Sequence, residues 1–189
     1  MRTGASIPSP PRLFVDQVIV SSQHKAFAPT LMKKFVALAM AILVVAIGCR
    51  KSDDPVVKVG AEDSEMNAAI SATQASMTNF MAVFRHPQTN QQYFLIKAKF
   101  TAGDVVEHIW VADLRYDGSV FHGVIANDPE SIPGLRFKQP VEIQLEQISD
   151  WMFVQDGKLV GGYTSRVLRK RMTAQQRREL DVHIPYKYE

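Results

Sequence analysis

A single histidine with acidic and amide neighbours is the part of this sequence best suited to chemistry. His108 follows Glu107, a predicted hairpin places it opposite Asn127, and Asp150 begins a second acid-aromatic pair. One imidazole with two or three nearby oxygens can bind a metal ion, or act as a general base that a carboxylate orients. The candidate catalytic residues are therefore His108, Glu107, Asn127 and Asp150.

The sequence lacks the motifs that would make this site specific. It contains no H-x-x-x-H, no H-E-x-x-H, no G-x-S-x-G and no phosphate-binding glycine loop. We therefore predict no metal and no cofactor. Thr164 and Ser165 are the nearest candidates for a nucleophile, because the one cysteine has another use.

A structural interpretation of the histidine region is simpler than a catalytic one. His108 and Asp150 would then satisfy backbone groups at strand ends, while Trp110 and Trp151 pack the core. This interpretation is favoured, so the sequence leans away from an enzyme without excluding one.

Basic residues gather near the C-terminus. Residues 166–179 hold six Arg or Lys and a single acid, Glu179. Such a cluster can bind anionic lipid headgroups, lipopolysaccharide phosphates or an acidic partner protein. Alternatively, it is a solvated helix face whose arginine stems cover Val167 and Leu168. The candidate binding residues are Trp110, Trp151, Tyr163, Arg166, Arg169 and Arg171.

The strongest signal lies in the N-terminal third. Lys33 and Lys34 precede an uncharged apolar run, residues 35–48, that ends in Ala-Ile-Gly before Cys49. That run has 14 residues, whereas a membrane-spanning helix needs about 20. It resembles the signal peptide and lipobox of bacterial lipoproteins, which implies that Cys49 is lipidated and anchors the chain to a membrane. A structural buried cysteine and an uncleaved anchor helix are the alternatives.

The residues around this signal predict how the chain is divided. Residues 1–31 do not fit a signal n-region, so translation is expected to start at Met32. Residues 32–48 form the signal peptide, and 49–61 form a flexible tether. Arg50 replaces the aspartate that marks inner-membrane retention, which indicates an outer-membrane location facing the periplasm in a Gram-negative host.

Processing at Cys49 changes the charge. The 189 residues carry 22 Lys+Arg and 19 Asp+Glu, a net +3. Five of those cations and one acid precede Cys49, which leaves 17 against 18 in the remaining 141 residues. Nucleic acid is therefore not an expected partner. A chain of this length forms one domain with one core.

A helix is predicted to open the domain. Asp63 or Ser64 can cap it, and Pro87 stops it. Apolar residues at helical spacing form one stripe that must pack against something, rather than a cofactor site. The stripe consists of Met66, Ile70, Thr73, Met77, Phe80, Met81 and Phe84.

Strands are predicted to follow. In residues 92–100, Phe94, Ile96, Ala98 and Phe100 share one face, with Lys97 and Lys99 on the other. Residues 104–114 and 119–127 form a hairpin around Asp117-Gly118 that is apolar along the middle of both faces, and so is either covered on both sides or curled into a barrel-like sheet. Its predicted register pairs Leu114 with Phe121, Ala112 with Gly123 and Trp110 with Ile125, and pairs Asp113 with His122 as ions.

The remaining pattern completes an α+β fold. Residues 128–140 read as a loop, strands follow near 141–145 and 151–160, and Thr173 with Gln176 opens a short helix. We therefore expect an N-terminal amphipathic helix packed on a curved, mainly antiparallel sheet of about five to six strands, with a short C-terminal helix.

Five short motifs in order resemble a known bacterial family. They are S-E-M-N-A-A-I from Ser64, E-H-I-W-V from Glu107, F-H-G-V-I-A-N-D-P from Phe121, I-S-D-W-M from Ile148 and G-G-Y-T-S-R from Gly161. This succession resembles the bacterial domain of unknown function 2314 over residues 62–181, which leaves 182–189 as a tail. The resemblance implies a compact α+β domain, often on secreted or lipid-anchored proteins, and no established reaction.

The sequence thus predicts a lipid-anchored envelope protein whose domain is a binding or interaction module. Its expected partners are the membrane, through the lipid on Cys49, and a protein or an anionic envelope component. Two alternatives remain open: a small envelope enzyme that uses His108, Glu107, Asn127 and Asp150, and an immunity-type protein that binds a toxin.

Overall fold

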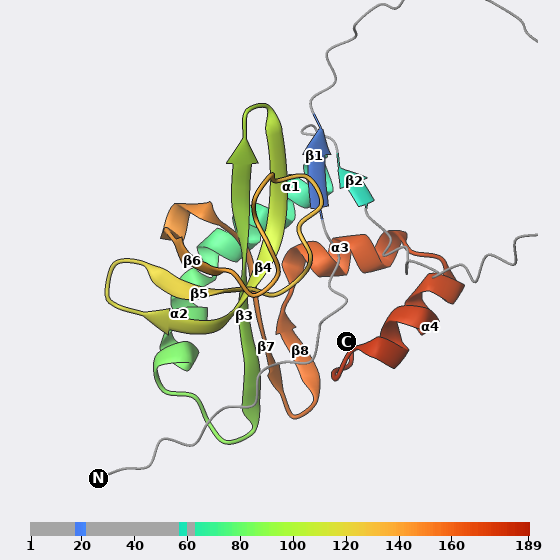
Figure 1. Ribbon diagram of the computed structural model, residues 1–189. Helices are drawn as coiled ribbons and strands as arrows, with labels where there is room; N and C mark the ends of the chain where they lie inside the picture. The colour runs from blue at the N-terminus through green and yellow to red at the C-terminus, as the bar shows by residue number, and fades with distance from the viewer. Residues whose placement is uncertain (1–17, 22–56, 60–62) are drawn as a thin grey trace, which may run out of the picture.

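The chain folds as a curved β-sheet with helices packed on it (Figure 1). The computed structural model describes residues 18–21, 57–59 and 63–189. Within them the strand order is β2-β1-β4-β3-β7-β8, with β5 beside β4 and β6 beside β5. The predicted α+β fold is confirmed.

In chain order the elements are β1 (Val18–Ser21), β2 (Val57–Val59), α1 (Ser64–Ala75), α2 (Met77–Arg85), β3 (Gln91–Ala102), β4 (Val105–Tyr116), β5 (Phe121–Ile125), β6 (Pro140–Ile143), the 3-10 helix η1 (Leu145–Gln147), β7 (Ile148–Gln155), β8 (Lys158–Gly161), α3 (Tyr163–Arg171) and α4 (Ala174–His183).

Strands β3 to β8 pair antiparallel and correspond to the five to six strands that the sequence predicts. β1 and β2 add a parallel pair at one edge. β1 lies within residues 1–31, where the sequence has no strand period. One edge of β4 is shared, because its first part, Val105–His108, pairs with β1 and its second part, Val111–Tyr116, pairs with β5.

The helical stripe is real, but it runs along two helices rather than one. Asp63 caps α1 by accepting the backbone N–H of Met66 at 3.0 Å. The helix then breaks at Ser76, whose hydroxyl donates to the carbonyl oxygens of Ala72 and Thr73 at 2.7 and 3.1 Å. A serine that bonds back to the preceding turn competes with continued helix formation. α2 restarts at Met77 and ends at Arg85.

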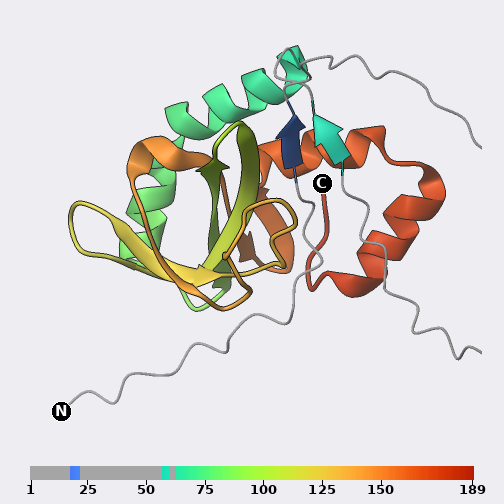
Figure 2. The same ribbon diagram turned by 45° about the horizontal axis from the view of Figure 1, so that its top comes forward.

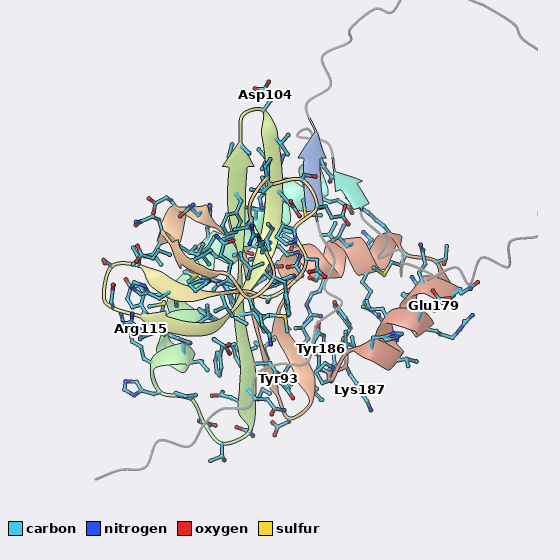
Figure 3. The ribbon with its side chains drawn as sticks, viewed as in Figure 1. Tyr93, Asp104, Arg115, Glu179, Tyr186 and Lys187 are labelled. Carbon is cyan, nitrogen blue, oxygen red and sulfur yellow. The ribbon has the colours of Figure 1, made fainter. Side chains whose placement is uncertain are left out.

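Both faces of the sheet are covered, as the hairpin pattern predicts. α1 and α2 run along one face, and α3 and α4 lie beside the sheet (Figure 2). Ile109 and Val111 of β4 point into a core with Phe80 of α2, whereas Trp110 and Ala112 point to the other face. Residues after α4 close that second face. Tyr186 packs there on the same side as Tyr93 (Figure 3).

The predicted register of the β4–β5 hairpin is wrong. Tyr116 pairs with Phe121, and Val111 pairs with Ile125. The turn spans four residues because the Asp117 carboxylate accepts the backbone N–H groups of Ser119 and Val120. Strand β4 also has a bulge at Asp113, four residues before Asp117, where φ is +52°. Since each change shifts the pairing, the register inferred from a two-residue turn cannot hold.

The predicted ion pair between Asp113 and His122 is therefore also wrong. His122 pairs with Arg115 across the strands, and its imidazole contacts Asp117 at 2.8 Å and Glu142 at 3.5 Å. The hydrogen bond from His122 and those from the turn amides hold the pKa of Asp117 well below its usual range.

None of the helices in the described part of the chain is long and apolar enough to cross a membrane.

Candidate functional site

A buried lysine and a buried aspartate face each other at the centre of the sheet. Lys97 of β3 pairs with Asp150 of β7, and neither side chain has exposed surface. The Asp150 carboxylate accepts the backbone N–H groups of Tyr163 and Thr164 at 3.0 and 2.8 Å. These are the first two amides of α3, and the preceding Gly162 has no side chain to cap them. Asp150 therefore caps α3 from a neighbouring strand.

Thr164 joins the two charges. Its hydroxyl donates to Asp150 Oδ2 at 2.6 Å and accepts from Lys97 Nζ at 3.1 Å. Thr73 of α1 reaches the same carboxylate at 3.4 Å. Burial raises the pKa of Asp150, against the opposing influence of Lys97 and of the Thr164 hydrogen bonds. The cluster thus ties β3, β7, α1 and α3 together through one carboxylate.

The lysine ammonium also lies over an aromatic ring. Lys97 Nζ is 4.7 Å from the centre of the Trp110 ring, a distance at which the ring face attracts a cation. A buried charge is tolerated only with such partners, because leaving water is costly.

His108 lies on the same sheet but has a different partner. Its Nδ1 is 2.7 Å from the Ser149 hydroxyl, and that hydroxyl donates to the carbonyl oxygen of Lys97 at 3.2 Å. Ser149 has one hydroxyl hydrogen, so it accepts from an imidazole protonated on Nδ1. Burial, with the positive charges of Lys97 and Lys99, lowers the pKa of His108 to about 4. The imidazole is therefore neutral at pH 7.

Glu107 bonds to a loop and not to the other candidate residues. Its two carboxylate oxygens accept the backbone N–H groups of Glu130 and Ser131 at 2.9 and 2.8 Å. The side chain is fully buried. Both oxygens are therefore used to fix the start of the long loop between β5 and β6.

The Asn127 side chain bonds to the backbone of β4 at one edge of that strand. Its Oδ1 accepts the backbone N–H of Trp110 at 2.8 Å, and the carbonyl of Trp110 accepts the N–H of Ala126 at 2.8 Å. The Asn127 amide nitrogen is buried and has no hydrogen-bond acceptor within the described residues. Asn127 thus lies between the stretches of β4 that pair with β1 and with β5.

The four candidate catalytic residues are brought into one region of the sheet but not into a shared opening. Each is at least nine-tenths buried. His108 bonds to Ser149, Glu107 to loop amides, Asn127 to a strand amide, and Asp150 to the start of α3. Thr164 and Ser165 are buried as well. Among the described residues no three His, Cys, Asp or Glu side chains converge as metal ligands.

The aromatic candidates for binding lie inside the domain. Trp110 and Trp151 are buried, and Trp151 Nε1 donates to the carbonyl oxygen of Thr73 at 3.3 Å. Tyr163 is half-buried and packs edge-on against Trp151, with ring centres 5.6 Å apart. Trp151 and Tyr163 join α1 and α3 to β7, and Trp110 packs in the core cluster on the other face of the sheet.

Three of the six cations of the basic segment, Arg169, Lys170 and Arg171, form ion pairs within the fold. Arg166 donates to the carbonyl oxygens of Leu159 and Gly161, and Arg169 pairs with Asp181 at 2.7 Å. Arg171 pairs with both Asp63 and Glu65 and holds the pKa of Asp63 at about 2. Arg178 is exposed and makes no such pair within the described residues. Arg166, Arg169 and Arg171 thus connect α3 to its neighbours.

Lys97 is the site residue that the sequence does not single out. Alternation places it with Lys99 on the face opposite Phe94, but only Lys97 is fully buried, whereas Lys99 is exposed. Phe94, Ile96, Ala98 and Phe100 do share the predicted apolar face. Only the pairing of β3 with β7 brings Asp150 beside Lys97, so the strand pattern alone carries no signal for this pair.

Comparisons with known proteins give the family. Residues 63–186 match the family described as "Uncharacterized protein conserved in bacteria (DUF2314)". The uncharacterized protein YegJ of Escherichia coli K12 is 31% identical over 133 residues, which cover 70% of this chain and 86% of that protein. A putative ankyrin repeat protein of Neisseria meningitidis serogroup B is 37% identical over 79 residues, 42% of this chain and 31% of that protein. No solved structure matches the chain.

A single domain thus carries both the buried polar cluster and the family match, since Lys97, Asp150 and Thr164 all lie within the matched residues. The chain belongs to the bacterial DUF2314 family of uncharacterised proteins.

Proposed function

We propose that this protein is an envelope lipoprotein, anchored through Cys49, whose DUF2314 domain is a binding or interaction module. The observation that supports a binding role is the state of its reactive side chains. His108, Glu107 and Asp150 are all buried and engaged in hydrogen bonds that hold elements together. A group committed in this way is poorly placed to meet a substrate.

The lipoprotein part of the proposal rests on the sequence. The lipobox-like segment ends at Cys49, and that cysteine lies outside the described residues. The family match begins at Asp63, so only a short segment separates the proposed anchor from the domain. Arg50 favours the outer membrane, facing the periplasm, in a Gram-negative host.

A relative supports the interaction part. The Neisseria protein is named as a putative ankyrin repeat protein. Ankyrin repeats stack into extended binding surfaces. A domain of this family that shares a chain with such repeats fits an interaction role better than an isolated reaction.

Lipidation is tested by expressing the full chain in a Gram-negative host and fractionating the envelope. Intact mass should show an N-terminus at Cys49 carrying acyl chains, and the protein should partition into the outer-membrane fraction. A Cys49→Ser variant is the matched control and should remain unprocessed. A purified wild-type protein that retains residues 1–48 and carries no lipid would contradict the proposal.

The binding role needs a separate test. The lipidated protein is cross-linked in its own envelope, recovered under denaturing conditions, and compared with the Cys49→Ser control. A partner that is enriched in stoichiometric amount with the wild type supports an interaction module. Recovery of the wild-type protein free of any partner, together with turnover of a small molecule that His108→Gln abolishes, would favour the enzyme instead.

A further inference from the structure

The sheet contains a strand that the proposed processing would remove. β1, Val18–Ser21, precedes Cys49 in the chain, whereas β2, Val57–Val59, follows it. β1 pairs antiparallel with Val105–His108 of β4, and β2 pairs parallel with β1. In the full chain, β1 therefore stands between β2 and the rest of the sheet.

Cleavage before Cys49 would leave two unpaired elements. The stretch Val105–His108 would lose its partner on one edge, while β3 still pairs with the other. β2 would lose β1, with which it pairs in the sheet. An open row of backbone N–H and C=O groups is a template for another strand, and proteins usually cover it.

We infer that in the processed protein Val57–Val59 moves across by one strand and pairs directly with β4, an inference that rests on the proposed processing. The existing register fixes the new one. Ile19 is opposite both Lys58 and Glu107, and Val20 is opposite both Val59 and Val106. β2 runs parallel to β1, which runs antiparallel to β4. β2 is thus already antiparallel to β4 and one strand spacing, about 4.8 Å, from the vacated position.

One feature favours this occupant over a strand from another molecule. β2 lies four positions before Asp63, the cap of α1, so its local concentration near the edge is high. A strand from another molecule has no such tether and would have to bind from dilute solution.

The new pairing also sets the position of the domain at the membrane. With β2 docked on β4, the sequence leaves residues 50–56 between the lipidated cysteine and the sheet. A segment of that length reaches about 25 Å when fully extended. The β4 edge is thereby held close to the bilayer, and the free tether is shortened.

A pair of engineered cysteines, Val59→Cys with Val106→Cys, tests the exchange. In the unprocessed chain Val20 stands between the two positions. They are then two strand spacings apart, beyond the roughly 7 Å between Cα atoms that a disulfide permits. In the processed chain they become direct neighbours. Lipid blocks the Cys49 thiol, so the two engineered thiols are free of competition.

The expected result is an intramolecular disulfide in the processed protein and none in a Cys49→Ser form that begins at Met1 and so retains β1, read by mass after non-reducing digestion. A Cys49→Ser form that begins at Met32 lacks β1 and should form the disulfide as well. Val59→Cys with Thr101→Cys is the matched control and should stay reduced in both forms, because Thr101 lies on the far side of Val106. Hydrogen exchange at residues 105–108 should remain slow after processing, within about tenfold of the unprocessed chain.

Three outcomes would overturn the inference. The first is a processed protein that stays reduced and whose residues 105–108 exchange freely, and the second is a disulfide that joins two molecules. The third uses a protease site introduced between residues 49 and 53 of the full chain, which removes the leader in vitro: the inference fails if no disulfide forms after that cut.

The N-terminal mass shows separately whether processing occurs. Failure of the proposed function is therefore recognised independently of failure of this inference.

Discussion

The buried histidine makes the stability of this domain depend on pH in a defined window. His108 donates from Nδ1 to Ser149 and has Lys97 and Lys99 as its charged neighbours. Burial lowers its pKa from 6.5 to about 4. The unfolded chain therefore binds a proton at a pH where the folded chain does not. The contribution of His108 to the free energy of unfolding is therefore complete above pH 6.5 and is lost as the pH falls toward 4.

The size of the effect follows from the shift. A difference of one pKa unit corresponds to about 1.4 kcal/mol, so the lowered pKa of His108 represents about 3 kcal/mol between pH 6.5 and 4. Asp150 acts in the opposite direction, because its raised pKa favours the folded state as the pH falls. Asp63, with a pKa of about 2, contributes mainly below this window.

Comparison of the wild type with His108→Gln isolates the contribution of His108 to the pH dependence of stability. Urea unfolding of the wild type and of His108→Gln is followed at several pH values from 7 to 4. The free energy of unfolding of the wild type should fall relative to that of the variant by about 3 kcal/mol across this range. His86→Gln, at an exposed histidine away from this cluster, serves as the control. Parallel pH curves for the wild type and His108→Gln would refute the reasoning.

Three further substitutions probe the contacts around β7 and α3. Asp150→Ala removes the carboxylate that lies beside Lys97 and caps α3. Urea unfolding should show that the free energy of unfolding falls by on the order of 3–5 kcal/mol. A fall of under 1 kcal/mol would contradict the capping role. Gly161→Ala places a Cβ against the carbonyl oxygen of Trp151 and 2.5 Å from its ring, at a φ of +74°. Thermal unfolding should therefore show a loss of about 2 kcal/mol or more in the free energy of unfolding. An unchanged melting temperature would refute the close approach. Arg171→Gln breaks an exposed ion pair and should cost less than about 1 kcal/mol, a loss that disappears in 1 M salt; a larger, salt-independent loss would show that the arginine acts through packing.

Much of the architecture follows from patterns within single elements. Helical spacing from Met66 to Phe84 predicts the covering layer, and alternation from Phe94 to Phe100 predicts a strand with one apolar face. Both patterns depend only on where neighbouring side chains point in a regular backbone. The break at Ser76 has no signal in the sequence, because a serine within a helix is common and its hydrogen bond back to Ala72 depends on side-chain geometry.

The register of the hairpin illustrates where such reasoning stops. A two-residue turn at Asp117-Gly118 is a sound expectation from sequence alone. The Asp117 side chain instead organises a longer turn, and Asp113 inserts a bulge. The longer turn moves the pairing by two residues and the bulge moves it back by one, so small local choices propagate to every cross-strand contact.

The sequence by itself determines the class of fold, the strands and helices with regular apolar periods, and a lipobox-like segment ending at Cys49. Only the tertiary structure decides the environment of Lys97. An alternating strand predicts only that this lysine shares a face with Lys99, whereas in the structure β7 brings Asp150 beside it and α3 brings Thr164. A charge can be buried only where distant elements supply its partners, and the position of those partners is a property of the assembled sheet.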